Sequence, residues 1–233
     1  MINCVMIPAL GCDERLYEPI AEALEDRVVT QTRMVSETTL DACVAKVLES
    51  VEGDFIILGT SFGGRVALEV ALASPQRVKG LVVIGSGAGP VADPAAGLKR
   101  SAMLRAGELE QVAAEMGAII SRMPGSNGPA TRAAFIAMMR TQGADFIARQ
   151  ADALAKRVDL WPRLHEIGCP ALMLWGAHDQ FSPDADGQRM ASQMPHGRYV
   201  ELADCGHFPT LEYPDAATAA IVAWLDDVDD VEN

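Results

Sequence analysis

Short apolar segments alternate with longer amphipathic segments along most of the chain. The apolar segments are rich in Val, Ile and Leu and predict strands centred on Val5–Ile7, Val28–Thr30, Phe55–Leu58, Leu81–Ile84, Ala171–Leu174 and Tyr199–Leu202. Between them, apolar residues recur at helical spacing, as at Leu40, Val44, Val47 and Val51. This alternation predicts an α/β fold, in which helices wrap a mostly parallel sheet of about six strands.

The alternation stops between about residues 87 and 160. This stretch is rich in Ala and Met, shows helical periodicity and lacks a convincing strand, and the loop 124–129 divides it. We therefore expect a core built from residues 1–87 and 161–233 and a helical lid, residues 88–160, that covers the carboxyl edge of the sheet. We expect most lid methionines to pack the lid against the core. The last helix is expected over about Asp215–Leu225, followed by a frayed acidic tail.

A glycine-flanked serine follows one of the predicted strands directly. The sequence Gly59-Thr60-Ser61-Phe62-Gly63 comes after Phe55–Leu58 and precedes a helical pattern. In this strand–turn–helix setting, G-x-S-x-G is typical of a nucleophilic serine on a sharp turn. Side chains at positions 59 and 63 would collide with neighbouring backbone, which explains the two glycines. The alternative interpretation is an ordinary glycine-rich turn.

A nucleophilic serine needs a base within hydrogen-bond reach and an acid that orients the base. Of the four histidines, His207 lies in a loop directly after the last predicted strand, at the same sheet edge as Ser61. Asp179 follows the preceding strand and is the candidate acid. Asp204, close to His207 in sequence, is a weaker alternative. The order Ser61, Asp179, His207 is the one expected for an α/β-hydrolase.

Composition narrows the class of protein further. With 49% hydrophobic and 22% charged residues, the chain is expected to fold into a globular protein. Its net charge of −13, with no basic stripe to contact a phosphate backbone, argues against nucleic-acid binding. No apolar run approaches the roughly 20 residues that span a bilayer, and no signal peptide is evident. The five cysteines form no C-x-x-C pair, which favours free thiols and a cytoplasmic location.

Four segments together resemble those of lid-bearing members of the α/β-hydrolase superfamily: Ile7–Cys12, Gly59–Gly63, Trp175–Asp179 and Cys205–Phe208. The resemblance covers essentially the whole chain apart from the lid. It implies a triad of Ser61, His207 and Asp179. It also implies an oxyanion hole made by the backbone N–H groups of Phe62 and Leu10, although Pro8-Ala9 stands where the family often has His-Gly. No metal or organic cofactor is implied.

The chain departs from this family at its beginning. The family sheet usually has eight strands and opens with a hairpin, whereas this chain begins with the strand that leads into Pro8. We therefore expect the polar segment Arg27–Arg33 to form an exposed edge strand, with a dimer through that edge as an alternative. Arg65, just past the turn, is expected to be structural and to face outward.

The resemblance implies a serine hydrolase that cleaves a small carboxylic ester with an apolar portion. The serine argues against the dehalogenases and epoxide hydrolases of this superfamily, which use an aspartate nucleophile. The same triad also serves C–C bond hydrolysis, lactone opening and lyase chemistry, and a non-catalytic ligand receptor is the alternative from another class. No nucleic-acid or membrane partner is expected, and the oligomeric state stays open. One lid arginine is a possible anchor for a substrate carboxylate, although a solvated helix face is the more frequent role.

Overall fold

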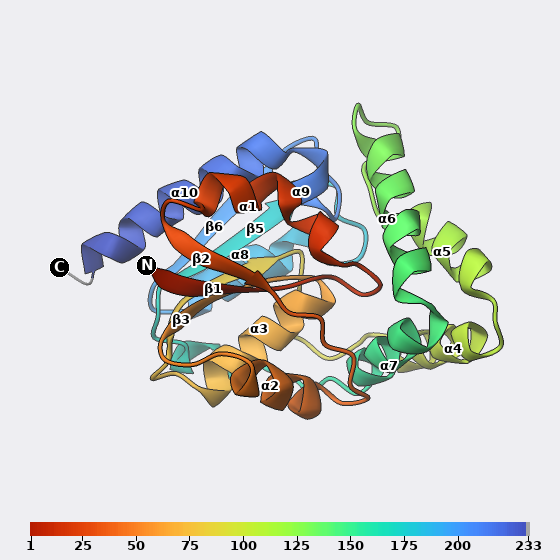
Figure 1. Cartoon of the computed structure of the whole chain (residues 1–233), viewed down its shortest axis with the longest axis horizontal. Helices are drawn as coiled ribbons and strands as arrows, with labels where there is room; N and C mark the ends of the chain where they lie inside the picture. The colour runs from red at the N-terminus through yellow and green to blue at the C-terminus, as the bar shows by residue number, and fades with distance from the viewer. Residues whose placement is uncertain (232–233) are drawn as a thin grey trace.

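A parallel sheet of six strands forms the centre of the fold (Figure 1). The computed structural model describes residues 1–231. The strands lie in the order β2-β1-β3-β4-β5-β6, with the bounds β1 Ile2–Ile7, β2 Val28–Thr32, β3 Phe55–Thr60, β4 Val78–Ile84, β5 Ala171–Gly176 and β6 Gly197–Leu202. Each predicted strand is present. The strands β3 and β5 are buried along their whole length, because helices cover both faces of the sheet.

Helices cover both faces of this sheet. Figure 1 shows α1 and α10 on one face and α2 and α3 on the other, and α8 packs against β5 and β6. Their bounds, with those of the shorter elements of the core, are η1 Glu14–Leu16, α1 Glu18–Leu24, α2 Leu40–Glu49, α3 Phe62–Ala73, η2 Trp161–Glu166, α8 Asp184–Gln193, α9 Pro209–Glu212 and α10 Pro214–Val231. The expected edge strand is β2, which pairs with β1 at one end of the sheet. Over residues 1–231, none of the helices has the length and apolar character that crossing a bilayer requires.

The last helix is longer than the sequence pattern predicts. The frayed tail expected from Asp226 onward is wrong as far as Val231, because α10 continues to that residue; residues 232–233 lie outside the described chain. Trp224 and Val228 are both buried, so the apolar side of the helix extends past the predicted end. An ion pair of 2.9 Å between Arg27 and Asp226 also ties this part of α10 to the core.

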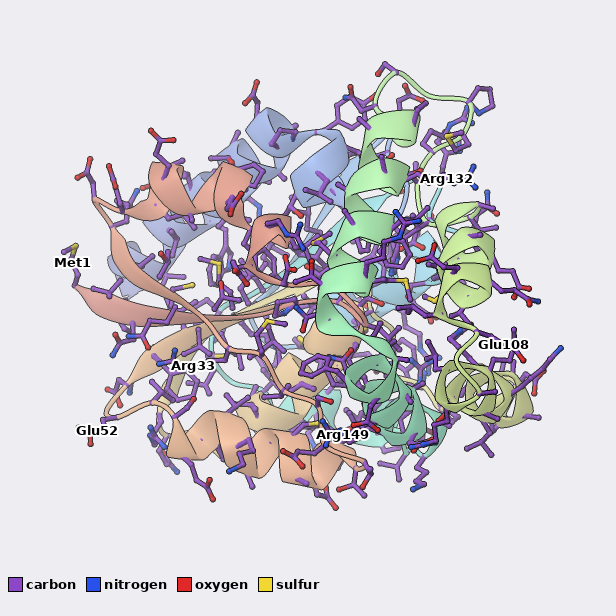
Figure 2. The ribbon with its side chains drawn as sticks, turned by 45° about the vertical axis from the view of Figure 1, so that its right-hand side comes forward. Met1, Arg33, Glu52, Glu108, Arg132 and Arg149 are labelled. Atoms are coloured by element: carbon purple, nitrogen blue, oxygen red, sulfur yellow. The ribbon has the colours of Figure 1, made fainter. Side chains whose placement is uncertain are left out.

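Residues 88–160, the segment expected to form a lid and called the lid below, contain four helices and no strand. They are α4 Pro94–Arg105, α5 Leu109–Gly117, α6 Gly128–Gln142 and α7 Ala144–Ala155. Figure 1 places them beyond the carboxyl ends of the strands, and Figure 2 shows α6, which carries Arg132, in front of that edge. Met116, Met138 and Met139 are buried, whereas Met123 is exposed. The methionine-rich helices therefore pack mainly inward, over the loops that follow β1 and β3.

Arg65 of α3 joins the two ends of the lid. Its guanidinium is fully buried, and it donates hydrogen bonds to the carbonyl oxygens of Ala88 (2.8 Å) and Val158 (2.6 Å). Its Nε donates to Glu69 Oε1 at 2.7 Å. The expectation that Arg65 faces outward is wrong: the side chain turns inward because the two lid ends offer it carbonyl acceptors and Glu69 balances its charge. Burial lowers the pKa of Arg65.

Replacing Arg65 with Met is expected to lower the free energy of unfolding by about 3–5 kcal/mol, because it strands the Glu69 carboxylate and two carbonyls in a buried site. Urea unfolding followed by circular dichroism measures this change. The double variant Arg65→Met/Glu69→Leu removes the stranded carboxylate and should recover part of the loss. A single variant within about 1 kcal/mol of wild type would contradict a buried, charge-balanced site.

Candidate active site

Ser61 occupies a strained turn between β3 and α3. Its φ is 54° and its ψ is −112°, and it is the only non-glycine residue of the described chain with a positive φ. Its N–H donates to the carbonyl oxygen of Ile84 at 2.8 Å, at the end of β4. A Cβ at position 59 would collide with the carbonyl of Gly63, and one at position 63 with the carbonyl of Ile7. The two glycines therefore permit a turn that the surrounding backbone holds in place.

Asp179 and His207 form a buried hydrogen-bonded pair. His207 Nδ1 lies 2.7 Å from Asp179 Oδ2, and the side chains are 2% and 1% exposed. The other carboxylate oxygen, Oδ1, accepts the backbone N–H groups of Phe181 (2.8 Å) and Ser182 (3.0 Å). An ionised carboxylate only accepts hydrogen bonds, so Nδ1 carries the proton and Nε2 is left as the basic nitrogen. The turn after β5 thus fixes the carboxylate, and the carboxylate fixes the imidazole.

Gly85, at the end of β4, lies against this pair. Its φ is +56°, and a Cβ there would stand 2.9 Å from Asp179 Oδ2 and 3.1 Å from His207 Nδ1. The residue before it, Ile84, accepts the N–H of Ser61. The end of β4 therefore brings Ser61 and the Asp179–His207 pair to the same place. Among the described residues no direct hydrogen bond joins Ser61 to His207, and such bonds are often long before a substrate binds.

The other candidates from the sequence lie elsewhere. Asp204 is exposed, pairs with Arg122 at 3.4 Å and accepts the hydroxyl of Tyr213 at 2.9 Å. It makes no contact with the imidazole of His207, whereas Asp179 does. The three remaining histidines are all exposed: His165, His178 and His196. Of the residues predicted from the sequence, the structure therefore brings together Asp179 and His207, beside the turn that carries Ser61.

Phe62 and Leu10, the predicted oxyanion donors, lie on the two sides of a close backbone contact. Phe62 is the first residue of α3, so its N–H has no intrahelical acceptor and lies at the positive end of the helix dipole. Leu10 is in the loop after β1, and its N–H donates to no other residue of the described chain. The carbonyls of Ile7 and Pro8 pack directly on Gly63. This contact places the loop of Leu10 next to the turn of Ser61.

Two buried side chains that sequence reasoning missed hold this loop. The hydroxyl of Tyr17 donates to the carbonyl of Ile7 at 2.7 Å and lies 2.9 Å from Thr60 Oγ1, which can donate in return. Gln150, on lid helix α7, accepts the N–H of Gly11 at 2.9 Å. These partners are 10 to 139 positions apart in the chain. No local pattern marks either residue, because Tyr17 meets its partners only once the strands have assembled, and Gln150 only once α7 has packed on the core.

A third missed residue, Glu212, ties the loop of His207 to the lid. The carboxylate is buried: Oε2 accepts the backbone N–H groups of Gly206 and Arg122, both at 3.0 Å, and Oε1 accepts that of Phe208 at 3.3 Å. Burial raises the pKa of Glu212, and these three N–H groups act in the opposite direction. The backbone on both sides of His207 is therefore held by one carboxylate. In the sequence, Glu212 is marked only by being an acidic residue within an otherwise largely apolar segment.

Replacing Glu212 with Gln is expected to lower the free energy of unfolding by about 1–3 kcal/mol, because an amide nitrogen cannot accept and leaves a buried N–H unpaired. The kcat should fall as well, since Glu212 holds the backbone on both sides of His207 through the N–H groups of Gly206 and Phe208. Thermal unfolding and ester turnover measure both effects. The matched control is Asp204→Asn, which alters an exposed acid of the same loop; equal stability of the two variants would contradict the role of Glu212.

The two cysteines nearest the site are Cys12 and Cys205. Both are buried, and burial raises the pKa of each thiol far above its usual range. Neither supplies a thiolate near neutral pH, because the nucleophilic form needs a lowered pKa. Their surroundings thus favour packing over nucleophilic chemistry.

The sequence of this chain is similar to those of known hydrolases. A sequence model described as "Alpha/beta hydrolase family" matches residues 4–221. The 2-hydroxy-6-oxononadienedioate/2-hydroxy-6-oxononatrienedioate hydrolase of Paraburkholderia xenovorans (strain LB400) is 29% identical in an alignment over 176 residues that covers 72% of this chain and 61% of that relative. The chain thus spans about three fifths of that relative's length. The pimeloyl-[acyl-carrier protein] methyl ester esterase of Nitrosomonas europaea is 27% identical over 232 residues, 91% of each chain.

Solved structures share the same architecture. A thermophilic esterase from Thermogutta terrifontis superposes with a TM-score of 0.88 at 23% identity, covering 98% of this chain and 90% of that one. The enol-lactonase from Burkholderia xenovorans LB400 superposes with a TM-score of 0.87 at 21% identity, covering 97% and 92%. At these identities the similarity shows the fold.

Proposed function

Because the chain belongs to the alpha/beta hydrolase family, we propose that it is a serine hydrolase that cleaves a small carboxylic ester through an acyl-enzyme intermediate. The observation that carries the proposal is the buried Asp179–His207 pair, joined at 2.7 Å, beside the strained turn of Ser61. These three residues lie at one edge of the sheet. In a serine hydrolase the serine is the nucleophile, the imidazole is the base and the carboxylate is the acid that orients the base.

The reaction uses groups that the chain itself supplies. Nε2 of His207 takes the proton of Ser61 Oγ as that oxygen bonds to the substrate carbonyl, and the N–H groups of Phe62 and Leu10 hold the oxyanion. Asp179 stabilises the imidazolium that forms. His207 then gives its proton to the leaving alcohol as the C–O bond breaks. In the second half, His207 deprotonates a water molecule, which attacks the acyl carbon; the bond to Ser61 Oγ then breaks, and His207 returns the proton to that oxygen, releasing the acid and free Ser61.

The relative that matches over nearly its whole length supports an ester as the substrate. The Nitrosomonas protein is named a methyl ester esterase and shares 91% coverage with this chain. A second candidate, C–C bond hydrolysis, is favoured by the relatives named for 2-hydroxy-6-oxo-dioates. A compound of that name has a ketone and two carboxylates but no ester, so its hydrolysis breaks a carbon–carbon bond. The same Ser61–His207 pair would serve both reactions.

The test is hydrolysis of p-nitrophenyl esters from acetate to decanoate, with a 2-hydroxy-6-oxo-dienedioate assayed in parallel. Sustained release of p-nitrophenol, with the highest kcat/KM on an ester, is the expected result. If kcat/KM for the ketone exceeds kcat/KM for the best ester by more than about tenfold, the second candidate is favoured. A tenfold ratio corresponds to about 1.4 kcal/mol of additional transition-state stabilisation. Protein that is folded but turns over neither substrate would contradict the proposal and favour a ligand receptor.

A further inference from the structure

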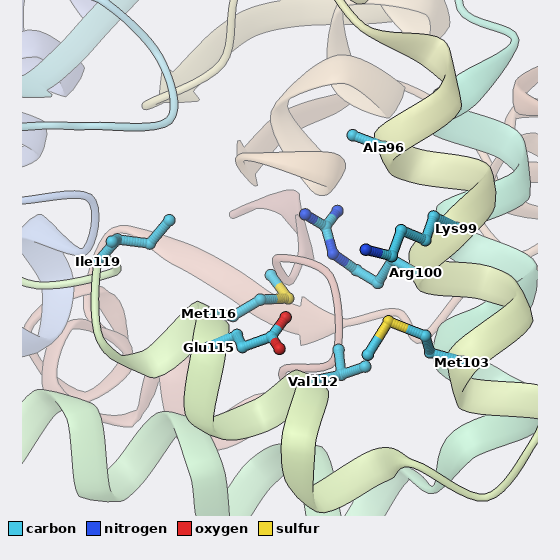
Figure 3. A pocket seen from close by; sticks show the side chains of 8 residues that line it. All are labelled: Ala96, Lys99, Arg100, Met103, Val112, Glu115, Met116 and Ile119. Carbon is cyan, nitrogen blue, oxygen red and sulfur yellow. The ribbon is translucent and has the colours of Figure 1, made fainter.

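The lid contains a pocket of its own, between α4 and α5 (Figure 3). Its volume is about 250 Å³, enough for roughly eight water-sized groups. Five of the eight side chains that line it are apolar: Ala96, Met103, Val112, Met116 and Ile119. Such a wall suits a short hydrocarbon chain, and methionine adapts readily to its shape.

The charged groups of this pocket are Arg100, Lys99 and Glu115. Figure 3 shows the guanidinium of Arg100 extending from α4 into the pocket, with Glu115 facing it from α5. Two cations and one anion leave a net positive pocket on a chain whose net charge is −13. The sign of the pocket is therefore opposite to that of the whole protein, which favours an anionic ligand there.

Arg100 lacks a polar partner inside the pocket. The side chain is partly buried, and no hydrogen bond or ion pair of 4 Å or less joins it to another residue of the described chain. Burial lowers the pKa of Arg100, and the charge of Glu115 acts in the opposite direction. On the same helix, Arg105 pairs with Asp152 at 2.6 Å. A guanidinium that is partly removed from water without a partner costs free energy, which a bound carboxylate would recover through two parallel hydrogen bonds.

The pocket lies next to the candidate active site. Ile119 lines it, and the carbonyl of the following residue, Ile120, accepts the N–H of His207 at 3.1 Å. The segment that ends the pocket wall therefore contacts the loop that carries the imidazole.

We propose that Arg100 binds a carboxylate at the far end of the substrate, so that the preferred substrate is a half-ester of a short dicarboxylic acid. Lys99 adds a second positive charge, and the apolar wall covers the methylene groups between the ester and the carboxylate. The choice of a half-ester rests on the proposed ester hydrolysis. The binding of a carboxylate by Arg100 does not, and the two are tested separately.

The first test compares kcat/KM for mono-p-nitrophenyl adipate and for p-nitrophenyl hexanoate, two esters of equal acyl length that differ in the terminal carboxylate. Wild type is expected to prefer the adipate half-ester. Arg100→Gln should lower the adipate-to-hexanoate ratio of kcat/KM about 10- to 100-fold, the usual range for a charged hydrogen bond. Glutamine has a helix propensity close to that of arginine, so α4 should persist. Arg140→Gln, an exposed lid arginine paired with Glu110, is the control and should keep the wild-type ratio.

The second test needs no turnover. In Ser61→Ala protein, titration calorimetry compares sodium hexanoate with its neutral analogue hexanamide. Hexanoate is expected to bind more tightly, and adding Arg100→Gln should weaken hexanoate about tenfold or more while hexanamide changes little.

The two results separate the proposals. If esters are hydrolysed but Arg100→Gln keeps the wild-type adipate-to-hexanoate ratio, the carboxylate site is wrong and ester hydrolysis stands. If no ester is hydrolysed but hexanoate binding depends on Arg100, the site stands and ester hydrolysis is wrong. Equal binding of hexanoate and hexanamide by the Ser61→Ala protein overturns the carboxylate site in either case.

Discussion

Ser61→Ala is expected to lower kcat for p-nitrophenyl ester hydrolysis by about 10⁵- to 10⁶-fold, the range in which loss of the nucleophile removes the whole serine–histidine unit. The alanine has no oxygen to form the acyl-enzyme, so His207 has no proton to take. Residual turnover would come from the oxyanion donors and from binding alone. Steady-state and pre-steady-state release of p-nitrophenol measure the loss, and the burst that reports an acyl-enzyme should vanish.

The fold of this variant should be unchanged, because alanine keeps the Cβ of serine and the glycines around the turn are untouched. Circular dichroism and thermal unfolding check this directly. Ser126→Ala is the matched control, since Ser126 is an exposed serine of the lid loop, and its kcat should equal that of wild type. A folded Ser61→Ala protein that keeps more than about a tenth of wild-type kcat would exclude Ser61 as the nucleophile.

Asp179→Asn is expected to lower kcat by about 10⁴-fold through the tautomer of His207. Oδ1 of Asp179 accepts two backbone N–H groups, from Phe181 and Ser182, and an asparagine oxygen in the same place keeps both bonds. Its NH₂ group must then face Nδ1 of His207, 2.7 Å away in the wild type. An NH₂ group donates, so Nδ1 becomes the acceptor and the proton moves to Nε2. A protonated Nε2 cannot take the proton of Ser61.

The comparison for this variant is Asp204→Asn, which alters the rival acid. Asp204 faces Arg122 and Tyr213, so its replacement should leave kcat near the wild-type value. Both variants keep the shape of the side chain, and thermal unfolding should show that both are folded. A large loss in Asp204→Asn together with a small loss in Asp179→Asn would transfer the acid role to Asp204.

Local chemistry explains what could be predicted of the fold. Short apolar runs bounded by turn signals are typical of strands in an α/β fold, and all six strands were predicted from such runs. The turn at Ser61 is local as well, since the sterics of Gly59 and Gly63 involve backbone only a few residues away or in the neighbouring strand. The end of α10 was missed because the pattern from Trp224 onward makes a helix only where a core is present to bury it.

The charged and polar side chains that hold the site were decided by the tertiary structure. Arg65 reaches Val158 across 93 positions, and Glu212 reaches the N–H of Arg122 across 90. In sequence these residues look like ordinary solvated charges, because a lone charge is normally exposed. The same holds for Arg100, which differs from paired lid arginines such as Arg105 and Arg140 in the pocket around it and in the absence of a partner within the described chain.

The sequence by itself thus determined the elements and the kind of chemistry: six parallel strands, a helical lid, and a serine, an aspartate and a histidine in hydrolase order. The tertiary structure shows that the predicted acid, Asp179, rather than Asp204 contacts the imidazole, and it alone decided which buried groups hold the loop of that imidazole. It also decided where the lid leaves an unpaired cation. The physical reason is that secondary structure and tight turns follow from interactions between near neighbours in the chain, whereas the burial of a polar group depends on partners that only the folded chain brings within hydrogen-bond reach.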